Sequence, residues 1–107
     1  MPVIDQAFAD DLLNYSTRWP RERETISLFE ALLGDEVDPF HRESLAGHFT
    51  ASVWLVSADA RRVLLTHHRK LGMWLQLGGH ADGERDLRVA AMKEAEEESG
   101  LTGLNIE

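Results

Sequence analysis

Residues 79–101 of the chain read GHADGERDLRVAAMKEAEEESGL. The stretch predicts a single helix over residues 86–99, directly followed by a glycine that suits the end of a helix. Glu94, Glu97 and Glu98 follow the i, i+3, i+4 spacing, so their three carboxylates are expected on one helix face. Like charges at this spacing repel one another, and the helix macrodipole disfavours anions near a C-terminus. A hard divalent cation held by carboxylate oxygens is the natural candidate to offset that cost.

The acidic residues continue an apolar stripe of the predicted helix. Leu87, Ala90 and Ala91 lie on the same face at about 100° per residue, and a helix normally turns such a stripe toward the protein body. The alternative is a surface helix whose Glu-rich end is solvated, as runs of like charge usually are. The flanking sequence favours the first interpretation, because Gly78 and Gly79 end an apolar run and a glycine also closes the helix.

Several positions of this stretch match a known family signature in residue type and spacing. They are Gly79, Lys93-Glu94, Ala95, Glu97-Glu98 and Gly100-Leu101. With them the stretch resembles the signature of the Nudix hydrolases, and its length matches with no insertion or deletion. The resemblance covers roughly residues 48–106 of the chain.

Two positions depart from the signature. Arg85 stands where the family has a Glu, with Glu84 one residue before it, and Lys93 stands where the family has an Arg. In the family that Arg helps to orient a carboxylate, whereas Lys supplies charge without a planar bidentate fork. The first departure is interpreted as a turn one residue shorter before the helix. Neither departure removes a residue expected to bind metal.

The resemblance implies an α/β (α+β) fold, the Nudix α/β/α sandwich around a mixed sheet. Residues 1–47 are predicted to form an N-terminal helical extension, and residues 48–107 a Nudix-type domain that is incomplete at its C-terminus. In the family further strands and a second helix follow, so only the first half of the sandwich is expected here. A truncated protein, or a second copy that supplies the missing half, would account for this.

The extension shows helical periodicity from residue 2 to about residue 34. Trp19-Pro20 is expected to break this run into two helices, because the residue before a proline avoids helical geometry. Trp19 is interpreted as part of the packing of these helices. Residues 35–48 are predicted to form a connector.

The pattern changes to short β-branched and apolar runs from residue 49 onward. Residues 50–56 and 62–66 predict a hairpin, with Trp54 in the core by its strand position. Residues 73–77 predict a third strand, which leads into a glycine loop, and residues 101–106 are expected to begin another strand.

Composition narrows the classes of function. A chain of 107 residues suits one small domain, and its 43% apolar and 28% charged content fit a globular protein. The net charge of −8 argues against binding to a nucleic-acid backbone or an anionic membrane. Without cysteine, neither a disulfide nor a thiol-ligated zinc site is possible. No apolar run approaches membrane-spanning length, so a cytoplasmic setting is the default expectation.

The resemblance also implies roles for the acidic helix. Glu94, Glu97 and Glu98 are expected to be catalytic and, with Gly79, to bind Mg²⁺ (or Mn²⁺), which bridges the substrate pyrophosphate. The metal neutralises charge as a P–O bond breaks and helps to generate hydroxide from water. Glu97 is chosen as the general base. Gly79 has a second interpretation, in which it serves only a turn or a close approach of the backbone.

Three further residues are expected to contact substrate. His80 and His68 are placed near phosphates, and Trp74 is placed to stack on a nucleobase. The alternatives are histidines with ordinary surface or hydrogen-bonding roles and a tryptophan that anchors the sheet edge.

The leading hypothesis is a metal-dependent hydrolase acting on a pyrophosphate bond in a nucleoside diphosphate linked to another group. Its expected partners are that small molecule and, as a possibility, a second copy in a homodimer; no nucleic acid or membrane is expected. One rival is a non-catalytic nucleotide- or phosphate-binding regulatory module on the same scaffold. Another is a structural fragment whose function needs the absent half.

Overall fold

The computed structural model describes residues 6–106, and the chain divides into two compact units, Met1–Phe49 and Thr50–Glu107. The fold is mixed α+β with a helical segment ahead of the strands, which confirms the fold expected from the sequence. The predicted helical residues 2–5 lie outside the described part of the chain. None of the helices between residues 6 and 106 is long and apolar enough to cross a membrane.

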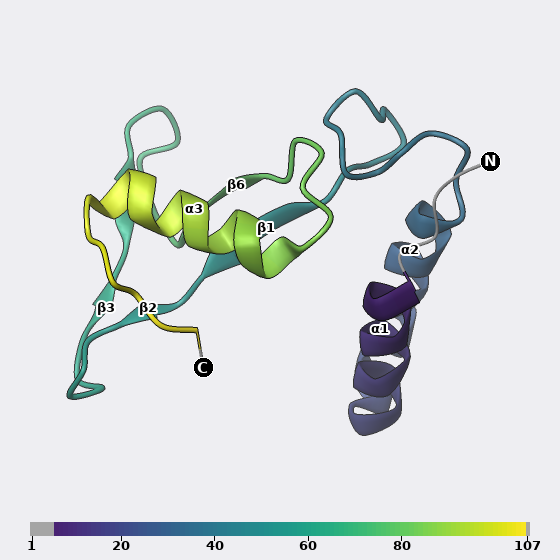
Figure 1. Cartoon of the computed structure of the whole chain (residues 1–107), viewed down its shortest axis with the longest axis horizontal. Coiled ribbons are helices and arrows are strands. Elements are labelled where there is room, and N and C mark those ends of the chain that lie inside the picture. The colour runs from purple at the N-terminus through teal and green to yellow at the C-terminus, as the bar shows by residue number, and fades with distance from the viewer. Residues whose placement is uncertain (1–5, 107) are drawn as a thin grey trace. The chain divides into compact units, whose positions relative to one another are not determined.

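Between residues 6 and 49 the first unit contains two α-helices that lie side by side (Figure 1). α1 spans Gln6–Arg18, the short 3-10 helix η1 spans Pro20–Glu22, and α2 spans Arg23–Leu33. The break falls where the sequence predicted it, because Trp19 leaves helical geometry with φ −126° and ψ 77°. Pro20 then takes the first position of the next turn, where its missing N–H costs nothing.

Four phenylalanines form the aromatic core of the first unit. Phe40 is 0% exposed, and its ring centroid lies 5.0 Å from that of Phe49. Phe49 also meets Phe8 edge-on at 5.3 Å and stacks on Phe29 at 5.7 Å. Phe40 belongs to residues 35–48, so the predicted connector supplies a central part of this core.

In the second unit, residues 50–106 form six short strands that pair in antiparallel fashion. They are β1 (Thr50–Val53), β2 (Leu55–Val56), β3 (Val63–Leu64), β4 (Thr66–His68), β5 (Met73–Leu75) and β6 (Leu77–His80). β1 pairs with β6, β2 with β3, and β4 with β5. The predicted hairpin is therefore confirmed for β2 and β3, whereas β1 pairs with the glycine-containing strand. Among residues 6–106 the implied mixed sheet is replaced by three two-stranded antiparallel sheets.

Single residues separate consecutive strands that belong to different pairs. Trp54 lies between β1 and β2, Leu65 between β3 and β4, and Gln76 between β5 and β6. The three two-stranded ribbons are thus linked to one another through Trp54, Leu65 and Gln76. We call these three residues the strand junction.

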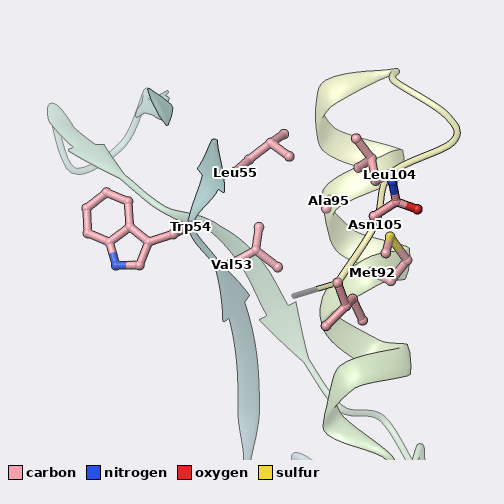
Figure 2. Close-up of a pocket in the computed structure, with 8 residues that line it drawn as sticks. Val53, Trp54, Leu55, Met92, Ala95, Leu104 and Asn105 are labelled. Atoms are coloured by element: carbon pink, nitrogen blue, oxygen red, sulfur yellow. The ribbon is translucent and has the colours of Figure 1, made fainter. Parts of the chain in front are cut away.

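Two tryptophans expected to be internal are exposed. Trp54 is 65% exposed and points away from α3, whereas Val53 and Leu55 point toward that helix (Figure 2). The prediction of a core Trp54 is wrong because strand alternation gives the helix-facing positions to its two neighbours. Trp19 is 51% exposed, and the guanidinium of Arg18 lies 5.5 Å from the centre of its ring.

α3 spans Leu87–Ser99 and packs along β1 and β6 (Figure 1). Its buried residues are Ala90, Ala91 and Ala95. Small side chains let the helix approach the two strands closely, and Ala51 of β1 belongs to the same core cluster as Ala90 and Ala91. The predicted inward stripe of α3 is confirmed.

The ends of α3 agree with the sequence signals. Asp86 is the N-cap residue, and its Oδ1 accepts a hydrogen bond of 3.0 Å from the backbone N–H of Arg88. Gly100 ends the helix in the left-handed conformation with φ 74°, where a glycine is favoured. Before the helix, the Oε1 of Glu84 accepts from the backbone N–H of Asp86 at 3.0 Å, which shapes the turn.

The strand predicted for residues 101–106 does not form. Gly103 has φ 70°, a left-handed conformation that interrupts an extended chain. Leu104, Asn105 and Ile106 instead line a cavity together with residues of β1, β2 and α3.

Candidate active site

Gly79 and Glu94 define the centre of the candidate site. A Cβ atom added to Gly79 would lie 2.6 Å from Cδ of Glu94, and 2.7 and 2.9 Å from its Oε1 and Oε2. Real Cβ atoms do not approach other atoms so closely, so the Glu94 carboxylate occupies the space that a side chain at position 79 would need. Gly79 lies within β6, opposite Ala51 of β1. The glycine loop expected from the sequence is therefore part of strand β6. The Glu94 carboxylate lies against this strand at Gly79.

Gly78 contacts the second carboxylate of the site, that of Glu98. Its backbone N–H donates a hydrogen bond to the carboxylate of Glu98. A Cβ atom on Gly78 would lie 2.5 Å from the carbonyl oxygen of Ala51 and 2.7 Å from Cβ of Ser52. The neighbouring strand β1 thus leaves no room for a side chain here, and Gly78 is needed for the pairing itself.

Glu98 sits in an environment that favours its protonated form. Loss of water around its carboxyl group raises its pKa most, followed by the negative charge of Glu94 and a hydrogen bond with the Glu94 carboxyl group. The hydrogen bond from Gly78 opposes this rise in pKa, and the charge of Glu97 adds to it. Glu98 is exposed by its total surface area, so the effect comes from its carboxyl end and its neighbours. The carboxyl group of Glu98 is therefore protonated more readily than that of an isolated glutamate.

Glu97 lies beside this pair but is an exposed residue. Within residues 6–106 no three His, Asp or Glu side chains are grouped so that they could hold a metal ion together. The structure thus brings Glu94 and Glu98 together, and the metal-binding and catalytic roles of all three acids stay predictions. Two carboxylates fit the usual protein complement of Mg²⁺, which keeps several waters and takes other ligands from substrate phosphates.

A polar cavity of about 360 Å³ lies next to Glu94. Its lining residues are His80, Ala81, Asp82, Gly83, Glu84, Val89, Ala90, Lys93 and Glu94. The predicted substrate residue His80 therefore shares one cavity with the predicted metal ligand Glu94. Asp82 and Lys93 also line it, although neither was predicted as a site residue. The signal for Lys93 was its place in the family signature, where the expected residue is an Arg.

Trp74 and His68 lie on a different part of the second unit and do not line this cavity. Trp74 is 67% exposed, and its ring meets that of His67 edge-on with centroids 4.9 Å apart. The Nδ1 of His68 accepts a hydrogen bond of 3.1 Å from the backbone N–H of Leu71 in the turn between β4 and β5. These contacts favour the alternative in which His68 serves the turn.

A second, largely apolar cavity of about 290 Å³ lies between α3 and strands β1 and β2 (Figure 2). Its lining residues are Val53, Trp54, Leu55, Met92, Ala95, Leu104, Asn105 and Ile106. None of the predicted site residues belongs to this lining. The carboxylates and the histidine lie elsewhere, so this cavity is not the centre of the expected chemistry.

Comparison with protein families gives one match. The model of the NUDIX domain matches residues 46–107. The matched segment covers more than half of the 107 residues and includes strands β1 to β6 and helix α3. A comparison with curated proteins finds no match.

Proposed function

The chain belongs to the Nudix hydrolase family, and we propose that it is a divalent-metal-dependent hydrolase that cleaves a pyrophosphate bond. The proposed substrate is a small nucleoside diphosphate linked to another group, and water is the nucleophile. The observation that carries the proposal is the meeting of the Glu94 and Glu98 carboxylates at two consecutive glycines of β6.

Glu94 and Glu98 are the residues that would hold Mg²⁺ or Mn²⁺, with Glu97 and the carbonyl of Gly79 as further contacts. Burial of the carboxyl group is the largest cause of the raised pKa of Glu98, and the negative charge of Glu94 is the second. A cation held there would relieve the second cause, which supports this role. Oxygen ligands suit both ions. When bound, the ion supplies charge neutralisation at the pyrophosphate and lowers the pKa of a water molecule.

The chain's own residues supply the remaining functions. Glu97 is the proposed general base and would accept a proton from the attacking water, which its exposed position allows. Lys93 and His80 line the same polar cavity as Glu94, and this supports a proposed role in which their nitrogen atoms contact substrate phosphate oxygens. The turn of residues 82–84 forms the other side of this cavity.

Hydrolysis of a substrate panel tests the proposal. Nucleotide sugars, dinucleoside polyphosphates and nucleoside triphosphates are each incubated with the purified protein and Mg²⁺, and the cleaved phosphates are separated by ion-exchange chromatography. The expected result is cleavage of at least one diphosphate-linked compound, abolished by EDTA and restored by Mg²⁺. No cleavage in any member of the panel would count against an enzyme.

The second candidate function is a regulatory module that binds a nucleotide without hydrolysing it. Lys93 favours it, because a lysine cannot orient a carboxylate with the two parallel hydrogen bonds of an arginine. Calorimetry distinguishes the two functions. Binding of a nucleoside diphosphate derivative with no turnover over hours selects the regulatory module.

A further inference from the structure

We propose that Gly79 is a positioning residue for Glu94, and that the lack of a side chain at position 79 sets the site's affinity for a divalent ion. The inference rests on the proposed metal-dependent function and deepens it. It concerns the position of the Glu94 carboxylate. The hydrogen bond between Gly78 and Glu98 does not control this position.

The steric contacts of Gly79 differ in kind from those of Gly78. All three atoms nearest to a Cβ at position 79 belong to the end of the Glu94 side chain. At position 78 the nearest atom is the backbone carbonyl oxygen of Ala51. A methyl group at position 79 can therefore be accommodated by rotation of Glu94, whereas one at position 78 must push two strands apart. Strand pairing therefore explains why position 78 is a glycine, but it does not explain the glycine at position 79.

Displacement of the Glu94 carboxylate would separate it from that of Glu98. The substitution leaves Gly78 and its hydrogen bond to Glu98 unchanged, so the displacement is expected at the Glu94 carboxylate. An ion that both carboxylates would hold would then lose one of its protein ligands. Substitutions that disturb the orientation of metal ligands typically lower affinity by about 10- to 100-fold.

The test measures the dissociation constant for Mn²⁺ by the electron paramagnetic resonance signal of the free ion. Four proteins are compared with the wild type: Gly79→Ala, Glu94→Asp, the double variant and Gly34→Ala. Gly79→Ala pushes the carboxylate outward and Glu94→Asp withdraws it, and both leave the net charge at −8. Gly34 is the matched control, because an added Cβ there meets only carbonyl oxygens at 3.7 Å and its φ is −86°.

We expect each single substitution at position 79 or 94 to weaken Mn²⁺ binding by about tenfold or more. The double variant should lose less than the product of the two losses, because the shorter aspartate no longer meets the new methyl group. Gly34→Ala should bind Mn²⁺ within about twofold of the wild type. Thermal unfolding midpoints are measured in parallel. If Gly79→Ala does not fold, the double variant is compared with Glu94→Asp instead, and the two should bind Mn²⁺ equally, because the shorter aspartate leaves room for the methyl group.

The outcomes separate this inference from the function on which it rests. Mn²⁺ binding by Gly79→Ala equal to that of the wild type overturns the positioning role alone. Losses that multiply in the double variant also overturn it, since the two residues would then act independently. A wild-type protein that binds no Mn²⁺ overturns the proposed function together with the positioning role.

Discussion

The backbone N–H of Gly78 donates a hydrogen bond to the carboxylate of Glu98, and this contact joins strand β6 to the last turn of helix α3. The strand thereby fixes one acidic side chain, while the neighbouring Gly79 leaves space for the carboxylate of Glu94. Two consecutive glycines thus serve two carboxylates in different ways. Gly78 provides a hydrogen-bond donor for Glu98, and Gly79 leaves space for the carboxylate of Glu94.

Replacement of Glu98 by glutamine should abolish most of the hydrolysis and leave the fold intact. Glutamine has nearly the same shape and can still accept the hydrogen bond from Gly78, but it lacks the charge that holds the ion. We expect the rate of hydrolysis to fall by about 100-fold or more. The matched control is Glu96→Gln on another face of α3, which should retain nearly full activity. Equal losses in both variants would contradict the role of Glu98.

The pH dependence of stability should reveal the raised pKa of Glu98 in the ion-free protein. The folded state binds a proton more tightly than the unfolded state, so this group's contribution is largest at low pH and is lost as pH rises through the folded-state pKa. Thermal unfolding midpoints are measured between about pH 4 and pH 7 for the wild type and Glu98→Gln. The wild type should lose stability relative to the variant as pH increases. A difference that stays constant across this range would contradict the raised pKa.

Loss of the N-cap of α3 should destabilise the second unit. Asp86→Ala removes the acceptor for the Arg88 backbone N–H, and we expect the unfolding midpoint to fall by about 4 °C. Asp86→Asn keeps a side-chain oxygen acceptor and should recover most of this loss. The Arg88 hydrogen bonds lower the pKa of Asp86, so its stabilising contribution should be lost as pH falls through that pKa.

The stacking role predicted for Trp74 can be tested by its effect on substrate binding. If Trp74 stacks on the base, Trp74→Ala should raise KM on the order of tenfold and leave kcat unchanged. Trp54 is the matched control, since it is 65% exposed and Trp74 is 67% exposed. Equal KM values for the two variants would instead support the interpretation of Trp74 as a structural partner of His67.

The aromatic core of the first unit should depend on Phe40. Phe40→Ala removes a fully buried ring, and we expect the free energy of unfolding of this unit to fall by about 3 to 5 kcal/mol. Leu45 lies in the same segment but is 99% exposed, so Leu45→Ala should change this free energy by less than about 0.5 kcal/mol. Chemical denaturation followed by circular dichroism gives both values.

Helix α3 could be predicted from the sequence because its signals are local. The apolar stripe, the acid at the N-cap and the glycine after the last turn lie within a few residues of the structure they determine. The breaks around Trp19-Pro20 and at Gly34 were predictable for the same reason. The burial of Phe40 was not, since it depends on the rings of Phe8 in α1 and Phe49.

The strand pairing could be predicted only in part. The hairpin of β2 and β3 is local, but β1 pairs with β6, more than twenty residues further along the chain. Alternation of apolar residues does not say which strand will be the partner, nor that Trp54 will lie where two ribbons meet. The expectation of a continuous strand through Trp54 failed for this reason.

The acidic residues of the candidate site could be predicted from the sequence, but the contacts around them could not. Helical spacing and the family signature both singled out Glu94 and Glu98. The hydrogen bond from Gly78 and the space above Gly79 arise only when β6 lies against α3, a contact between elements that the helix pattern alone does not determine.

The strand junction has a consequence for how the second unit exchanges its amide hydrogens with solvent. β2 and β3 share only two residue pairs, and these are separated from the β1–β6 ribbon by Trp54. The β2–β3 hairpin can open locally without disturbing the β1–β6 pair, which packs against α3. Deuterium should therefore enter the amides of Val56 and Val63 well before it enters those of Ala51 and Gly79. The part of this unit that opens least often is then the part that contacts Glu94 and Glu98.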